Sequence, residues 1–251
     1  HPISKAKISQ LAGLNKMTVS NCLDDLAEKG ITKVLGVTDS ARGRPPTLLG
    51  LNGDAGVYVG IDLGLMESKL LVTDLAGKEL ERGYLPELGY EPASLVNAIV
   101  STVAALKEKY GGSSLGLIGI GIAVPGHYND QTQVIEFVSD RTVWNGYPLL
   151  RELKKSLPDI PIHIQAAGPA GAMGEIHFGK SNPSETLAFI NGNWGLSLGV
   201  YTKGEAFTGH AGFAGRFGHT ILQVNGKKCV CGNRGCLEAY ASLRSLFEKL
   251  Y

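Results

Sequence analysis

The chain has 251 residues, of which 43% are hydrophobic and 19% are charged, and its formal net charge is +1. This balance is typical of a globular protein and excludes both a wholly disordered chain and a polycation. No apolar run is long enough to span a membrane and no signal peptide is visible, so we expect a cytoplasmic protein without a membrane partner.

Residues 4–29 predict two helices joined by a short turn. Ser4 can cap a helix that runs to about residue 12, and residues 13–15 then form a turn that contains a glycine. A second helix follows over about residues 16–29, with Val19, Leu23 and Leu26 at helical spacing. This order predicts a helix-turn-helix, and a helical hairpin that serves only for packing is the alternative.

The second helix opens with short polar and basic residues. Such residues suit a helix whose N-terminal part faces base edges and phosphates in a major groove. The candidate DNA-binding residues of this helix are Asn15, Lys16, Thr18, Ser20 and Asn21.

Residues 31–37 and 47–51 predict the two strands of a β-hairpin, which would form a wing behind the second helix. Arg42 and Arg44 lie between them in an Ala-Arg-Gly-Arg-Pro-Pro segment. Two arginines on an extended segment can enter a narrow minor groove, although a basic interdomain linker is the alternative. Residues 1–50 carry seven Lys and Arg against four Asp and Glu. We therefore assign them as a winged helix-turn-helix DNA-binding domain with a basic linker.

From residue 53 the pattern changes to strands with one long helix. Strands are expected over residues 57–64, 69–74, 78–85 and 115–124, with a helix over residues 92–110. A helix that ends near residue 157 and a strand over residues 160–165 follow. This part of the chain is therefore expected to be an α/β body.

One imidazole and three thiols lie close together near the end of the chain. Cys229 and Cys231 are separated by one residue, Cys236 follows, and His219 precedes the first cysteine by ten residues. Zinc takes this donor set in a closed tetrahedral site, and the glycines between the cysteines favour a tight loop. The alternatives are three unrelated buried cysteines or a disulfide, which would leave one thiol unpaired. We expect a structural Zn²⁺.

The Gly-His pair and the CVCGNRGCLE segment ten residues later resemble the signature of the ROK family of repressors, open reading frames and sugar kinases. The resemblance implies that the metal cluster shapes a sugar pocket, with His219 and Glu238 in contact with the sugar. It also implies a winged-helix head and an actin-like ATPase body with two lobes, over residues 54–127 and 128–251. The chain begins with His1 and family members continue beyond residue 251, so we expect truncation at both ends.

Three kinase motifs of the family are altered in this sequence. The first phosphate hairpin contains Leu65-Met66-Glu67, which places bulky and acidic side chains where small residues face phosphate. The second nucleotide motif is disrupted over residues 192–196. Ala167 stands where the resemblance places the aspartate that takes the proton from the sugar hydroxyl, and a methyl group cannot accept a proton. We therefore expect no phosphoryl transfer.

The expected sugar pocket is altered as well, because Arg216 replaces a glutamate of the family pattern. A neutral sugar can still bind weakly through His219 and Glu238 with Asn191, Trp144, Asn145 or Asn193. Alternatively, Arg216 pairs with Glu238 or binds an anionic ligand such as a sugar phosphate. Loss of ligand binding is a third reading.

The N-terminal pattern predicts a DNA-binding transcriptional regulator, and the resemblance implies a role in sugar catabolism with a kinase-like effector domain that we expect to be catalytically inactive. Repression is the favoured direction, and the resemblance implies xylose or glucose as the sugar class. A homodimer that reads a two-fold operator is expected from the family. The alternatives are an active sugar kinase and a DNA-binding protein that responds to no ligand.

Overall fold

The computed structural model describes residues 2–37, 46–86, 91–138, 141–180 and 186–250. The chain divides into two compact units. The first comprises His1–Val59, Leu71–Glu81 and Ala105–Ile118, and the second comprises Gly60–Leu70, Arg82–Ala104 and Gly119–Tyr251. None of the helices in the described ranges combines the length and the apolar content that crossing a bilayer requires.

Two helices open the first unit, α1 (Lys5–Ala12) and α2 (Lys16–Glu28). The Ser4 hydroxyl accepts a hydrogen bond from the backbone N–H three residues later, at 3.3 Å. α1 ends at Gly13, whose φ of 65° is a left-handed conformation that glycine adopts without strain. The Asn15 side chain caps α2 with a 2.8 Å hydrogen bond, also to the N–H three residues on. The two predicted helices and the turn between them are therefore confirmed.

An antiparallel three-stranded sheet completes this end of the chain. Its strands, in spatial order, are β1 (Ile3–Ser4), β3 (Thr47–Leu51) and β2 (Thr32–Val37). Val19 and Leu23 of α2 pack with Leu49 of β3, and Ile8 of α1 packs against this cluster. The predicted hairpin strands are present. Leu11 of α1 is exposed.

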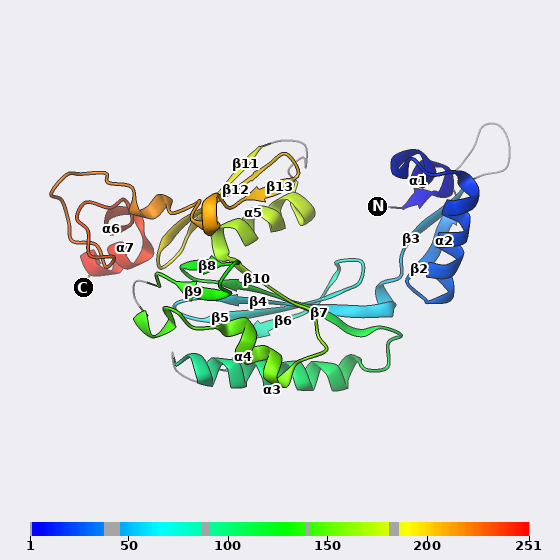
Figure 1. Cartoon of the computed structure of the whole chain (residues 1–251), viewed down its shortest axis with the longest axis horizontal. Helices are drawn as coiled ribbons and strands as arrows, with labels where there is room; N and C mark the ends of the chain where they lie inside the picture. The colour runs from blue at the N-terminus through cyan, green and yellow to red at the C-terminus, as the bar shows by residue number, and fades with distance from the viewer. Residues whose placement is uncertain (1, 38–45, 87–90, 139–140, 181–185, 251) are drawn as a thin grey trace. The chain divides into compact units, whose positions relative to one another are not determined.

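A five-stranded sheet has the strand order β10-β7-β4-β5-β6 (Figure 1). Its strands are β4 (Gly56–Leu63), β5 (Ser68–Asp74), β6 (Glu79–Tyr84), β7 (Gly116–Val124) and β10 (Ile162–Ala166). β10 is parallel to β7, with Ile162 opposite Ile120. The expected lobe boundary at residue 128 therefore does not coincide with the edge of this sheet, because a strand beyond that boundary pairs with a strand before it.

Two helices lie on one face of the five-stranded sheet, α3 (Pro92–Tyr110) and α4 (Leu149–Ser156) (Figure 1). Ile99 and Val103 of α3 are completely buried, and so are Leu149 and Leu153 of α4. Each pair is four residues apart, so each pair presents one apolar stripe to the sheet. The bounds of α3 agree with the predicted helix.

The helix α5 (Ala167–Phe178) follows β10 directly. It packs against a second antiparallel sheet of β11 (Leu187–Gly192), β12 (Leu196–Thr202) and β13 (Glu205–Phe207). Ala172, Ile176 and Tyr201 form the buried core between helix and sheet. The approach is close, since a Cβ atom added at Gly168 would lie 2.7 Å from the Leu198 carbonyl oxygen.

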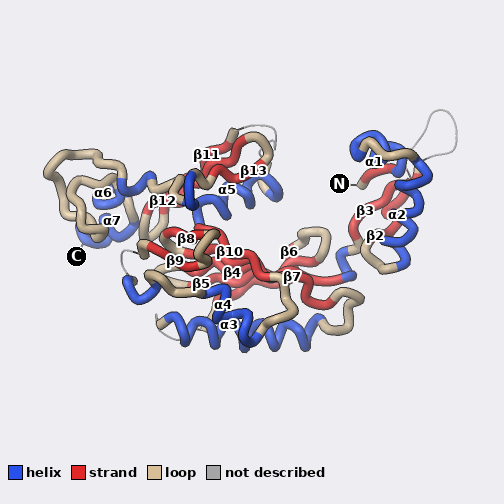
Figure 2. The backbone as a smooth tube through the Cα atoms, in the orientation of Figure 1, coloured by secondary structure: helices blue, strands red, loops and turns tan. Residues whose placement is uncertain are grey.

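Short elements and long loops complete the described chain (Figure 2). They are β8 (His127–Asn129), β9 (Val134–Glu136), α6 (Glu238–Ala241), α7 (Leu243–Leu250) and the 3-10 turns Gly53–Ala55, Thr142–Trp144, His210–Gly212 and Phe217–His219. The segment between the last 3-10 turn and α6 contains no helix or strand. It carries the predicted cysteine cluster.

Candidate metal centre and ligand pocket

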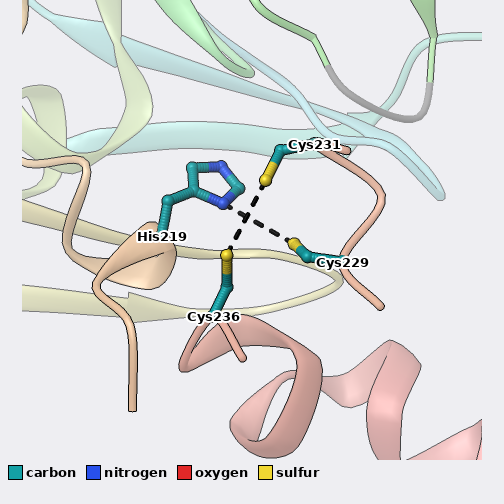
Figure 3. Close-up of side chains that lie close together, drawn as sticks. All are labelled: His219, Cys229, Cys231 and Cys236. Atoms are coloured by element: carbon teal, nitrogen blue, oxygen red, sulfur yellow. Dashed lines mark hydrogen bonds between the residues drawn. The ribbon is translucent and has the colours of Figure 1, made fainter. Parts of the chain in front are cut away.

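The four predicted metal ligands converge at one point (Figure 3). His219 ends a 3-10 turn, and Cys236 lies two residues before α6. Between them the chain forms a tight loop in which the Cys229 N–H donates a 2.8 Å hydrogen bond to the Asn233 carbonyl oxygen. Gly235 is required here, because its φ is 78° and a Cβ atom would lie 1.7 Å from the Gln223 carbonyl oxygen.

The donor atoms have the spacing of a tetrahedral site. All four lie within 4.8 Å of one another, with 3.8 Å between Cys229 Sγ and His219 Nδ1 and 3.7 Å between Cys231 Sγ and Cys236 Sγ. Ligands at about 2.3 Å from a tetrahedral ion are about 3.7 Å apart, so the geometry and the donor chemistry both fit zinc. The cluster is compatible with a structural zinc site.

Burial controls the ionisation of two of these thiols. Cys229 and Cys236 are buried, and burial raises the pKa of both, that of Cys236 to about 12. Without a cation these thiols stay protonated at neutral pH. A divalent ion would reverse this preference, because a coordinated thiol binds as the thiolate.

A pocket beside the cluster contains all four predicted ligand-binding residues, Asn191, Arg216, His219 and Glu238. Its walls come from the loop after β4, the first turn of α5, the hairpin between β11 and β12, and the loop before the cluster. Trp144 and Asn145 do not line it. The Asn145 side chain instead accepts a 2.8 Å hydrogen bond from the backbone N–H of Val138.

Glu238 is held by two partners. Its Oε2 accepts a 2.8 Å hydrogen bond from the Leu196 N–H, and its Oε1 lies 3.1 Å from Arg244 Nη2. Both charged residues are buried, so the pair is largely shielded from water. The alternative in which Arg216 pairs with Glu238 is therefore wrong, because Arg244 occupies that role.

Arg216 lies against two aromatic rings instead. Its Cζ is 4.4 Å from the ring centroid of Phe137 and 5.1 Å from that of Phe213. The Nε atom is buried, and it has no hydrogen-bond partner among the described residues. Burial lowers the pKa of Arg216, while the nearby Glu136 carboxylate opposes that shift. An arginine nevertheless keeps its charge at neutral pH.

His127 also lines the pocket, and its ring packs against Phe213. His127 is 2% exposed, and its ring centroid is 4.3 Å from that of Phe213. Its Nε2 is 3.9 Å from Glu136 Oε2. Gly212 has a φ of 77°, and a Cβ atom there would lie 2.6 Å from the imidazole. The sequence alone did not predict this packing, because His127 and Phe213 lie far apart in the chain.

The position expected for the base that deprotonates a sugar hydroxyl carries a methyl group, that of Ala167. Ala167 begins α5, and no side chain caps this helix. Burial raises the pKa of Asp62 at the end of β4, and Lys69 partly offsets the shift. Arg141 donates a hydrogen bond to the Leu65 carbonyl oxygen, which ties down the loop after β4.

The predicted DNA-binding residues of α2 differ in solvent exposure. Asn15, Lys16, Thr18 and Asn21 are exposed at the start of α2. Ser20 is half-buried, and its hydroxyl is 3.0 Å from Lys5 Nζ and 3.3 Å from Asp24 Oδ2. Arg42 and Arg44 lie outside the described residues. Cys22, also on α2, is exposed.

The comparisons with known proteins agree on one family. The sequence model of the ROK family matches residues 58–251. The xylose repressor of Bacillus subtilis (strain 168) is 34% identical over 249 residues, which are 99% of this chain and 64% of that repressor. The chain thus spans less than two thirds of the length of the curated relatives it matches.

Two solved structures show the same fold. The crystal structure of a ROK family transcriptional regulator, a homolog of the E. coli MLC protein, superimposes with a TM-score of 0.77 at 22% identity and covers 99% of this chain and 62% of that one. A ROK family glucokinase from Streptomyces griseus, in complex with glucose and AMPPNP, has a TM-score of 0.66 at 27% identity. It covers 77% of this chain and 59% of the glucokinase.

Proposed function

The chain belongs to the ROK family, and on that premise we propose that it is a DNA-binding transcriptional repressor of sugar catabolism with a catalytically inactive kinase-like body. The observation that carries the proposal is Ala167, which lines the pocket at the start of α5. A kinase needs a carboxylate there to take the proton of the attacking hydroxyl. A pocket that can bind a hydroxyl but cannot activate it suits a sensor.

We assign residues 1–50 as the winged helix-turn-helix that reads DNA, with α2 as the recognition helix and β2–β3 as the wing. The exposed polar residues at the start of α2 support this assignment, since recognition helices contact bases with their N-terminal residues. Lys16 supplies a phosphate contact, and Thr18, Asn21 and Asn15 supply hydrogen-bonding groups. Ser20, Arg42 and Arg44 complete the proposed interface.

The effector is proposed to be a sugar or a sugar phosphate bound in the pocket that Asn191, Arg216, His219 and Glu238 line. The 34% identical relative is named for xylose, so a pentose or a related sugar is the first class to test. Glu238 offers a carboxylate that its partners hold in a fixed position. Such preorganisation lowers the cost of ligand binding.

We propose that a structural Zn²⁺ joins His219, Cys229, Cys231 and Cys236. When bound, the ion supplies cross-linking and charge rather than chemistry, since four protein ligands leave no open position. His219 also lines the pocket, and Glu238 lies two residues after Cys236. The site therefore fixes part of the pocket wall.

The regulator is proposed to act as a cytoplasmic homodimer, because paired heads match a two-fold operator. A sugar that binds one arrangement of the body more tightly than another shifts the population between them. Operator affinity then changes by the same coupling free energy.

An active sugar kinase is the second candidate, and the likeness to a ROK glucokinase favours it. The two candidates differ in their output. A gel-shift titration with the promoter DNA upstream of the chain's own gene tests the regulator, and a coupled ATPase assay with a sugar panel tests the kinase. Sugar-dependent turnover that Glu238→Gln abolishes would establish the kinase instead.

The gel-shift titration has a matched pair of variants. Lys16→Gln removes a proposed phosphate contact, and we expect operator affinity to fall with a salt slope about one unit smaller. The control is Lys155→Gln. Lys155 is an exposed residue of α4 that forms an ion pair with Glu152, and its replacement should leave DNA binding unchanged. Equal effects of the two variants would contradict the assignment of α2.

A further inference from the structure

Arg216 has no direct ion-pair partner among the described residues, although the Glu136 carboxylate lies near it. Its buried Nε has no hydrogen-bond acceptor among those residues. Its guanidinium lies on the pocket wall, where its charge is partly removed from water. A half-buried charge without a direct ion-pair partner is costly, so an acceptor supplied by a ligand would stabilise it.

The two phenyl rings hold Arg216 without consuming its donors. Cζ is 4.4 Å from the Phe137 centroid and 5.1 Å from the Phe213 centroid. Rings that pack on a guanidinium face leave its N–H groups pointing outward in the plane, in the fork that matches a carboxylate or a phosphate. Phe137 has a φ of 55°, a left-handed backbone conformation that is uncommon for a non-glycine residue.

Negative charge in this region comes from two carboxyl groups on the pocket wall and from Glu136 near Arg216. The carboxylate of Glu238 is neutralised by Arg244 at 3.1 Å. The first turn of α5 lines the same pocket, and no side chain caps that helix. The N-terminus of a twelve-residue helix adds partial positive charge, which supports but does not by itself define an anion site. Asp62 is the other carboxyl group on the wall.

We propose that the effector of this pocket is an anionic sugar, in which a carboxylate or a phosphate forms a bidentate contact with Arg216 while Glu238 accepts hydrogen bonds from the hydroxyls. This inference rests on the proposed function, because it takes the pocket to be the effector site. It names the class of ligand, an oxyanion on a polyhydroxylated chain. Arg216 is then the specificity-determining residue, since a neutral sugar leaves its charge unpaired.

Isothermal titration calorimetry with matched ligands tests the proposal in the absence of DNA. The probes are D-glucose, D-gluconate and D-glucose 6-phosphate, together with D-xylose and D-xylonate. We expect at least one anion to bind about tenfold or more tightly than its neutral parent, and this preference to weaken as salt rises. The preferred anion distinguishes carboxylate from phosphate. Equal or tighter binding of the neutral sugars, or binding of none of the probes, would overturn the proposal.

Two variants identify the residue responsible. Arg216→Gln should weaken anion binding by roughly tenfold to a hundredfold and leave the neutral sugars unchanged. Arg216→Lys keeps the charge without the planar fork, so its anion affinity should lie between those of the wild type and Arg216→Gln. Arg151→Gln on the surface of α4 is the control and should have no effect. Unchanged anion affinity in Arg216→Gln contradicts the proposal, and if that variant does not fold, Arg216→Lys and the wild-type preference decide.

The outcome is separable from that of the proposed function. Operator binding is measured without ligand, and anion binding is measured without DNA. If the protein binds its operator but prefers neutral sugars, the anionic-effector proposal is contradicted and the proposed regulator function is kept. Anion binding without any operator binding removes the regulator and leaves the pocket chemistry in place.

Discussion

Arg244 on α7 and Glu238 on α6 form a buried ion pair, with 3.1 Å between Nη2 and Oε1. Their side chains are 11% and 9% exposed. Glu238 is thus both part of the pocket wall and part of the packing of the last two helices. The pair links the stability of this region to the geometry of the proposed ligand site.

Arg244→Met should destabilise the chain strongly. It leaves the Glu238 carboxylate buried without its cation, and such a loss costs about 3–5 kcal/mol. Glu238→Gln with Arg244→Met should recover part of that loss, because no unpaired charge remains. Urea denaturation checks both. Arg151→Ala breaks an exposed pair and should cost under about 1 kcal/mol, and a similar cost for Arg244→Met would show that the buried pair is unimportant.

The proposed metal centre predicts one zinc per chain. Elemental analysis of the purified protein should give this ratio, and Cys236→Ser should lose the metal and lower the thermal midpoint. Cys22→Ser is the matched control, since Cys22 is exposed and outside the cluster. Full metal content in Cys236→Ser would contradict the assigned ligand set.

Zinc uptake should also release protons. Burial raises the pKa of the Cys236 thiol to about 12, so this thiol is protonated in the metal-free protein at neutral pH and must lose its proton to bind. The metal is first removed with a chelator, and the chelator is then removed. Adding zinc to this metal-free protein in a weakly buffered solution should lower the pH. Metal binding without proton release would argue against thiolate ligands.

The sequence predicted local structure well where one segment carries the whole pattern. The long periodic stripe in residues 92–110 predicted α3, and the spacing of the cysteines predicted that they converge with His219. It failed where distant segments meet. The burial of His127 depends on Phe213, and the partner of Glu238 is Arg244, which no motif includes. The pairing of β10 with β7 in the five-stranded sheet was not predicted for the same reason, since parallel pairing between distant strands has no local sequence signal.

The cap of α2 separates stability from recognition. Asn15→Ala should cost about 1 kcal/mol, because the side chain accepts a hydrogen bond from the Thr18 N–H. Asn15→Asp keeps this acceptor and interacts well with the helix dipole, so stability should be retained. The new negative charge should nevertheless weaken operator binding. Wild-type DNA affinity in a stable Asn15→Asp protein would place α2 away from DNA.

The body should show no ATP-dependent phosphorylation of pentoses or hexoses, because Ala167 cannot accept a proton. Ala167→Asp should not restore turnover on its own, since the loop after β4 remains bulky and is tied down by Arg141. A coupled assay with the sugar panel checks both proteins. Turnover in the wild type would show that another group, such as Asp62, serves as the base.

Selection of bound sequences from a random duplex library tests the central claim most directly. The account predicts that the chain enriches one two-fold sequence and binds it about a thousandfold or more tightly than a scrambled duplex at the same salt concentration. Equal affinity for selected and scrambled duplexes, or no binding at low salt, would contradict the claim that this ROK protein is a sequence-specific regulator.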